Sequence, residues 1–184
     1  MLRYLLSRSL ERFERQWNYD AGYMRELLAL SPWAFIKFGL ATSLSRRTEA
    51  PMAAMAATGL VGTLAEDCGP CVQIGVDMAV AHGLPPAILA AILAGDEAAM
   101  GPDAALGYRF ARASLARDLE AGDAARAEVA RRWGAKAVTA LGLMLMTSRM
   151  YPTLKYATGH GRACSRVVVA GVAAPVRKPE PIAA

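Results

Sequence analysis

Two cysteines three positions apart are the residues of this sequence best suited to chemistry. Cys68-Gly69-Pro70-Cys71 has the spacing of a vicinal dithiol and holds two of the three cysteines in the chain. Such a pair can close a disulfide within one helical turn or supply half of a zinc site. Thioredoxins have the same Gly-Pro filling, but their motif follows a β-branched strand, whereas residues 55–66 here are typical of a helix. The motif therefore belongs to a different scaffold.

A helix that begins near Pro70 would place the backbone N–H groups of its first turn close to both sulfurs. Those dipoles favour a thiolate. The adjacent carboxylates of Glu66 and Asp67 either disfavour the thiolate by like charge or accept the thiol proton as a base beside a nucleophile. The sequence leaves both effects open.

A structural zinc site is the competing interpretation of the cysteines. His160 and Cys164 are four residues apart, so they would project from one face of a helix. With Cys68 and Cys71 they form a Cys₃His set, which is an established composition for structural zinc. In a purely structural alternative, the cysteines pack as small apolar residues and His160 is hydrogen-bonded or faces solvent.

The composition predicts an all-α protein. Hydrophobic residues make up 54% of the 184 positions and charged residues 20%, with many alanines and leucines and few aromatics. This length suits a single domain, which we place at residues 1–170. Within it, we expect residues 51–95 to form the core around the cysteines and residues 1–20 to form an amphipathic N-terminal helix or an oligomerisation arm. Residues 171–184 are rich in proline and are expected to be a flexible tail.

The charge pattern argues against nucleic-acid binding. The net charge is +5, but arginines alternate with acidic residues over positions 112–132, as on a solvated helix face. The longest uncharged stretch, residues 50–65, is too short and too rich in Ala and Gly to span a membrane. Arg3 and Arg8 interrupt the early leucines, so no signal peptide is visible. We expect a cytoplasmic protein without a membrane span.

Apolar periodicity and helix-start residues predict a series of helices. Ser31-Pro32 should cap one helix, Pro70 and Pro85-Pro86 should start two more, and Asp103 should cap another. No strand is predicted. The expected helical ranges are 2–17, 23–30, 33–44, a segment that ends near 65, 70–82, 86–95, 103–119, 123–150 and 152–170.

Two helices indicate a homo-oligomer. The first carries a narrow stripe of Leu2, Leu6, Leu10, Phe13 and Trp17 among mixed charges, which favours a partner helix over a membrane surface. The helix after residue 103 has two apolar stripes, as expected of a helix between the core and a neighbouring subunit. The stripes contain Leu106, Phe110 and Ala113 on one side and Tyr108, Leu115 and Leu119 on the other.

Residues 51–95 resemble the alkylhydroperoxidase D-like and carboxymuconolactone decarboxylase superfamily. The likeness rests on Glu66-Asp67-Cys68-Gly69-Pro70-Cys71 leading into a helix, followed by Gly83-Leu84-Pro85-Pro86 leading into another. It implies a helical bundle of that kind. It also implies that Cys71 attacks peroxide and that Cys68 resolves the product to a disulfide, which a thiol donor or a carrier protein then reduces.

The chain departs from the redox-active members of that superfamily at two positions. Their histidine one turn after the second cysteine is replaced by Gly75, and their upstream glutamate is replaced by Ala56. Glu66 is the best local replacement for this proton relay, and Asp67, Gln73 and Asp77 are poorer ones. We therefore predict Cys68, Cys71 and Glu66 as catalytic residues. We expect a peroxide or a thiol/disulfide partner as reactant and no cofactor. The alternative is a non-catalytic member that acts in assembly or small-ligand binding.

Overall fold

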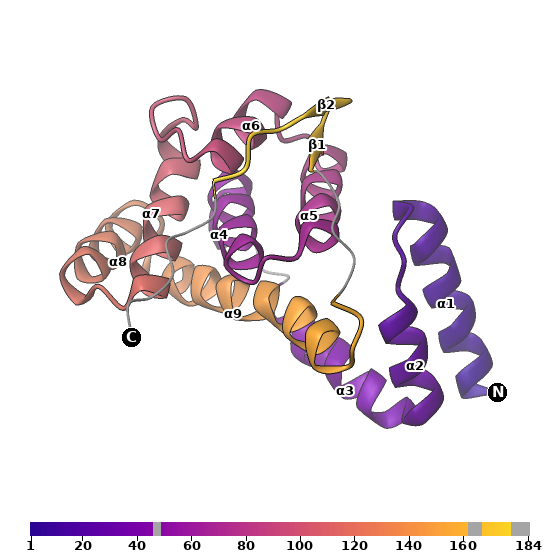
Figure 1. Ribbon diagram of the computed structural model, residues 1–184. Coiled ribbons are helices and arrows are strands. Elements are labelled where there is room, and N and C mark those ends of the chain that lie inside the picture. Colours follow the sequence, from indigo (N-terminus) through magenta and orange to yellow (C-terminus); the bar gives the residue numbers. More distant parts are fainter. Residues whose placement is uncertain (46–48, 162–166, 178–184) are drawn as a thin grey trace.

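The computed structural model describes residues 1–45, 49–161 and 167–177, and the account of the fold refers to these ranges (Figure 1). They are mostly helical, as the composition predicts. The elements in chain order are α1 (Leu2–Trp17), α2 (Gly22–Leu30), α3 (Pro32–Thr42), the 3₁₀ turn η1 (Ser43–Ser45), α4 (Met52–Ala65), α5 (Gly69–Ala81), α6 (Pro86–Ala94), α7 (Pro102–Ala116), α8 (Leu119–Trp133), α9 (Ala135–Ala157), β1 (Val168–Val169) and β2 (Val172–Ala173).

Helix α4 is the centre of the core, and α5, α6, α7 and α9 pack around it. Its sequence is apolar on every side, which is typical of a helix buried by several neighbours. Nine of its residues are buried, so the helix that carries the cysteines, α5, starts from a fixed support. Figure 1 shows α4 between α5 and α7, with α9 crossing beside them.

The α4–α7 crossing depends on a glycine. A Cβ added at Gly107 would lie 2.8 Å from the Cα of Ala54 and nearer still to its carbonyl oxygen. The backbones of the two helices therefore touch at this point. The buried hydroxyl of Thr58 donates a hydrogen bond to the Gly107 carbonyl at 3.1 Å, so the polar group that α4 brings into the contact is satisfied.

Several predicted helix boundaries are confirmed, and others are wrong. Ser31 caps α3 by accepting the Ala34 N–H at 3.1 Å. Asp103 does not cap α7; it lies in the first turn and binds Arg132 of α8 at 2.6 Å. The predicted helix over 123–150 is in fact divided at Gly134, whose φ of 88° breaks the α conformation.

The predicted restart at Pro152 is also wrong. Helix α9 continues through this proline to Ala157. Pro152 and Lys155 are buried in α9, and Leu154 packs on a small cluster made by α1 and α2. The burial of Pro152 and of the turn that follows it offsets the backbone hydrogen bond that a proline cannot donate.

A β-hairpin follows where the sequence predicted helix and then tail. Val168 pairs with Ala173 and Val169 with Val172 in an antiparallel register. Ala170 and Gly171 between them have φ values of 50° and 82°, the positive values that a two-residue hairpin turn requires. The Arg177 N–H donates to the Leu93 carbonyl at 2.8 Å, so residues 171–177 lie on the domain, and the rest of the predicted tail lies outside the described residues.

Gln73 attaches this hairpin to α5. Its side-chain amide donates to the Val168 carbonyl at 3.0 Å, and its carbonyl accepts the Val168 N–H at 2.7 Å. It also donates to Asp77 at 2.8 Å. Gln73 therefore takes the place of a neighbouring strand, and both its donor and its acceptor are in use.

We expect Gln73→Leu to lower the free energy of unfolding by about 1–3 kcal/mol, because it leaves both backbone groups of Val168 without a partner. Urea unfolding would measure the loss, and hydrogen exchange should show a faster Val168 amide. Gln16→Leu, at an exposed position of α1, is the control. Equal stability of the Gln73 variant and the wild type would contradict the attachment of the β-hairpin to α5 through Gln73.

The helices α1 and α2 form an antiparallel hairpin at one end of the molecule, away from α8 (Figure 1). Leu10, Ala21, Tyr23 and Met24 make its small core, against which residues of α3 and α9 pack. Leu2, Tyr4 and Leu5 of α1 are exposed. The helix over residues 2–17 is confirmed, and its predicted apolar stripe is buried at Leu10 and exposed at Leu2. A partner helix for this stripe stays a prediction.

The residues of the two predicted apolar stripes that lie in α7 are all buried within one chain. Leu106 and Phe110 pack in a cluster with α8 and α9, whereas Tyr108 and Leu115 pack in the main core with α4, α5 and α6. Leu119 lies at the start of α8 and is exposed. The stripes therefore do not require a neighbouring subunit. Among the described residues, no helix combines the length and the apolar character needed to cross a bilayer.

Candidate functional site

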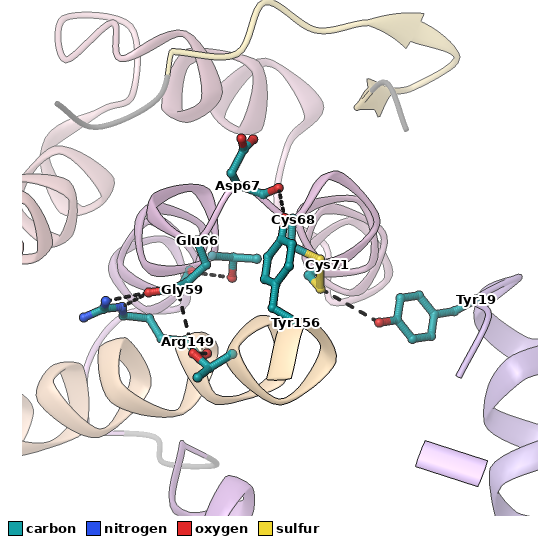
Figure 2. Close-up of a disulfide and its surroundings, with 10 residues drawn as sticks. Tyr19, Gly59, Glu66, Asp67, Cys68, Cys71, Arg149 and Tyr156 are labelled. Carbon is teal, nitrogen blue, oxygen red and sulfur yellow. Dashed lines mark hydrogen bonds and ion pairs between the residues drawn. A yellow bond between two sulfur atoms is a disulfide. The ribbon is translucent and has the colours of Figure 1, made fainter. Parts of the chain in front are cut away.

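The two cysteines of the motif form a disulfide at the start of α5 (Figure 2). Cys68 is the N-cap and Cys71 lies in the first turn, with Gly69 and Pro70 as the first two helical residues. The Cα atoms are 5.2 Å apart, a separation that suits a disulfide. Both residues are buried, with exposed fractions of 4% and 6%. The predicted pairing of the motif is thus present, beneath the surface.

Glu66 faces α9. Its carboxylate binds Arg149 at 2.5 Å and accepts a longer hydrogen bond from Thr153 at 3.5 Å. Figure 2 shows the carboxylate directed to the side opposite the disulfide. This ion pair joins the end of α4 to α9, which gives Glu66 a structural partner. Its catalytic role stays a prediction.

Asp67 shapes the turn that leads to Cys68. Its φ of 53° lies in the left-handed region, which asparagine and aspartate tolerate better than most residues. The Asp67 carbonyl accepts a hydrogen bond from the Tyr156 hydroxyl at 2.7 Å. Tyr156 stands beside the disulfide in Figure 2. Helix α9 therefore holds both residues that precede the motif.

Tyr19 approaches Cys71 from the opposite side. Its hydroxyl lies 3.9 Å from the Cys71 sulfur, within the range of a hydrogen bond to sulfur. A disulfide sulfur carries no hydrogen, so the tyrosine is the donor. Figure 2 shows its side chain directed at Cys71 from the N-terminal hairpin. Tyr19 is thus the described residue whose hydroxyl contacts a sulfur of the motif.

The α1–α2 connection fixes the position of Tyr19. Asn18 ends α1 in the left-handed conformation with φ 45°, and the Tyr19 N–H then donates to the Glu14 carbonyl at 3.1 Å. The Glu14 carboxylate accepts the Ala21 N–H at 2.8 Å and also pairs with Arg25. The ring of Phe13 packs edge-on against Tyr19, with centroids 6.2 Å apart. Helix capping, an ion pair and an aromatic contact therefore act together to fix the position of the Tyr19 side chain.

Lys155 of α9 lies behind the tyrosines. Its Nζ is 5.6 Å from the ring centroid of Tyr19 and 6.0 Å from that of Tyr23, which is cation–π geometry. The residue is 6% exposed. No carboxylate or carbonyl among the described residues forms an ion pair or hydrogen bond with its Nζ. The ammonium of this largely buried residue therefore faces two aromatic rings.

Burial shifts the pKa of all three groups away from the charged form. It raises the pKa of Tyr19, a shift that the hydrogen bond with Tyr23 opposes. It raises the pKa of Tyr23 far above the ordinary range, and the neighbouring Tyr19 adds to the shift. It lowers the pKa of Lys155, which Asp20 opposes. At neutral pH both tyrosines therefore keep their protons and can donate hydrogen bonds.

Gly75 and Ala56, which stand where the relay residues are missing, both pack against the core. A Cβ at Gly75 would lie 3.1 Å from Leu60 of α4, so this face of α5 rests on the core. Ala56 also packs against the main cluster. Gln73 donates to both Asp77 and the Val168 carbonyl of the β-hairpin, so Gln73 and Asp77 are engaged elsewhere. The proton relay of the superfamily has no equivalent at these positions.

The described residues do not assemble the zinc set. His160 Nε2 lies 2.7 Å from the Glu26 carboxylate, which accounts for that histidine. Cys164 falls outside the described residues. In the described part of the chain, no group of three or more His, Cys, Asp or Glu side chains is placed to hold a metal ion.

Comparisons with protein-family models, curated proteins and solved structures found no match. The superfamily resemblance accordingly rests on the Glu66–Cys71 motif and the helical context alone. The mostly helical fold is a finding of the structure, whereas the alkylhydroperoxidase D-like bundle and membership in that superfamily stay predictions.

Tyr19 and Lys155 are the residues that the sequence analysis missed. Tyr19 falls in the polar break between two helices, and 52 residues separate it from Cys71. A tyrosine within a polar turn is a weak signal of burial, because turn residues are ordinarily small or charged. No local sequence pattern indicates that Lys155 is buried, since its burial results from the contact between α9 and the α1–α2 hairpin.

Proposed function

We propose that this protein is a thiol-dependent oxidoreductase that reduces a peroxide or a disulfide through Cys68 and Cys71. The disulfide at the first turn of α5 is the observation that carries the proposal. A reversible pair needs two sulfurs in bonding range and a local field that favours a thiolate. The N-terminus of α5 supplies the second requirement through its unpaired N–H groups.

The superfamily resemblance suggests the order of events. The Cys71 thiolate attacks one peroxide oxygen, the O–O bond breaks, and the other oxygen leaves as an alcohol or water after taking up a proton. The Cys68 thiol then attacks the resulting sulfenic acid, and water leaves as the disulfide forms. The dithiol loses two electrons and the peroxide gains them. An external thiol restores the dithiol by exchange.

The burial of both sulfurs bears on the choice of reactant. With exposed fractions of 4% and 6%, the two cysteines offer little surface to a folded partner protein. A small hydroperoxide needs less access than a protein disulfide. Burial therefore favours the small reactant in the oxidising step.

The same burial supports a second candidate function. Buried cysteines are ordinarily less reactive than exposed ones. A disulfide kept permanently at the start of α5 would fit the non-catalytic alternative, in which the chain acts in assembly or small-ligand binding. The two functions differ in whether the reduced cysteines react.

Peroxide titration of the reduced protein distinguishes them. We expect the wild type to lose two hydrogen atoms by mass spectrometry and to lose two alkylatable thiols. Cys71→Ser should show no such change, whereas Cys68→Ser should stop at a sulfenic acid, because the resolving thiol is absent. Cys164→Ser keeps both cysteines of the motif and is the control. Slow alkylation and an unchanged mass in the wild type would favour the non-catalytic function.

A further inference from the structure

We propose that Tyr19 is a catalytic residue that donates a hydrogen bond to the Cys71 thiolate, and that Lys155 is a positioning residue that acts through Tyr19. This inference rests on the proposed thiol chemistry and names the groups that replace the missing relay. It assigns a role in the site to the N-terminal hairpin and to α9.

The contact with sulfur is the first support. The Tyr19 hydroxyl points at Cys71 from 3.9 Å while the sulfur is in the disulfide. Reduction leaves the sulfur in the same turn of α5 and adds negative charge to it when the thiol ionises. A donor already directed at that atom stabilises the charged form and lowers the pH at which the thiol ionises. The contact therefore becomes stronger in the reactive state.

The position of Lys155 is the second support. The ammonium of Lys155 lies over the ring face of Tyr19 and makes no ion pair with a carboxylate among the described residues, so it places positive charge behind the hydroxyl. The charge polarises the phenol and strengthens its O–H as a donor. The ammonium also favours a negative charge at the sulfur directly. The side chain is 6% exposed and its burial disfavours the charged form, which costs stability that a role in the site would explain.

The surroundings leave Tyr19 as the donor. The face of α5 that carries Gly75 rests on Leu60, and Glu66 is bound to Arg149. The titratable groups around Tyr19 and Lys155 come from three segments: Asp20 in the α1–α2 connection, Tyr23 in α2 and Tyr151 in α9. His160 lies beyond Tyr23, with ring centroids 6.4 Å apart. In the described part of the chain, none of these four side chains forms a hydrogen bond with a sulfur of the motif.

Alkylation of the reduced protein as a function of pH tests the proposal without peroxide. Tyr19→Phe should move the ionisation of the reactive thiol to higher pH by about one unit, a roughly tenfold loss of thiolate at neutral pH. Tyr4→Phe, at an exposed position of the same hairpin, should leave the profile unchanged. An unaltered profile in Tyr19→Phe would overturn the proposal.

Lys155 variants separate positioning from structural support. Lys155→Met replaces the buried cation with an apolar side chain of similar length, so the fold should be at least as stable while the thiol ionises at higher pH. Lys155→Arg should restore the profile. Lys136→Met, at an exposed position of α9, is the control. A profile that changes only in proportion to lost stability would overturn the role of Lys155.

The outcomes also separate this inference from the proposed function. If peroxide oxidises the wild type but Tyr19→Phe keeps the wild-type profile, the role of Tyr19 fails and the proposed function stands. If Tyr19→Phe shifts the profile but peroxide leaves the wild type unchanged, the hydrogen bond is confirmed and peroxide reduction fails.

Discussion

Gly107→Ala should lower the free energy of unfolding by about 3 kcal/mol. The added Cβ would lie 2.8 Å from the Cα of Ala54 and closer to its carbonyl oxygen. Both are backbone atoms, so no side chain can rotate to make room. The helices α4 and α7 would have to separate, which also weakens the Thr58 hydrogen bond to the Gly107 carbonyl. Urea unfolding followed by circular dichroism would measure the loss.

Gly142→Ala is a matched control for this prediction. Gly142 lies inside α9, and a Cβ there would meet nothing within 4 Å. Alanine costs less conformational entropy than glycine in a helix, so this variant should gain about 0.5–1 kcal/mol. Wild-type stability in Gly107→Ala would show that α4 and α7 do not approach as described. Because α4 also supports the start of α5, the destabilised variant should expose the cysteines to alkylation.

Much of the helical fold could be predicted from local signals. Ser31-Pro32, Pro70 and Pro86 mark helix starts because a cap or a fixed φ favours the first turn regardless of context. Asp103 shows where such signals fail, since its carboxylate forms an ion pair with Arg132 and leaves the cap position to Gly101. Asp103 could either cap the helix or form an ion pair, and the position of Arg132 in the folded chain favours the ion pair.

The C-terminal segment shows a second limit. Val167, Val168 and Val169 before Ala170-Gly171 are β-branched residues ahead of a turn, which is a hairpin signal. The helix predicted over 152–170 instead included these three valines. Gln73 supplies the hydrogen bonds that such a short hairpin lacks by itself. Its partner is 95 residues away, so no local pattern reports the contact.

The candidate site divides in the same way. The Cys68–Cys71 disulfide could be predicted because its two members are close in sequence. The orientation of Glu66 could not, because Arg149 competes for the carboxylate from another helix. Tyr19 and Lys155 reach the site only once α1, α2 and α9 have packed together. The part of the site that lies within one helical turn is thus visible in the sequence, and the part made by packing is not.

The wild type should lose stability steeply above about pH 10, because Tyr23 must ionise when the chain unfolds. Tyr23 is 3% exposed, and its burial raises its pKa far above the ordinary value of 10.0. Above that value the unfolded chain releases a proton that the folded protein keeps. The contribution of Tyr23 is therefore complete below about pH 10 and is lost at up to about 1.4 kcal/mol per pH unit as the pH rises.

The ionisation of Lys155 changes the free energy of unfolding in the opposite direction, over a different pH range. Its pKa is lowered below the ordinary value of 10.5, so the unfolded chain holds a proton that the folded protein has released. Stability rises with pH between the lowered pKa and about 10.5, and this gain is complete above that range. At higher pH Tyr23 lowers stability, and Tyr19, whose pKa burial also raises, acts with the same sign.

Tyr23→Phe tests this assignment, because phenylalanine keeps the ring in the hairpin core but cannot ionise. We expect its unfolding free energy to change less above pH 10 than that of the wild type, in urea titrations at a series of pH values. Tyr4→Phe should keep the wild-type slope, since Tyr4 is 63% exposed. Phenolate absorbance of Tyr23 should appear together with unfolding. A folded protein in which Tyr23 titrates near pH 10 would contradict its burial, and with it the packing of α2 against α9 that brings Tyr19 to Cys71.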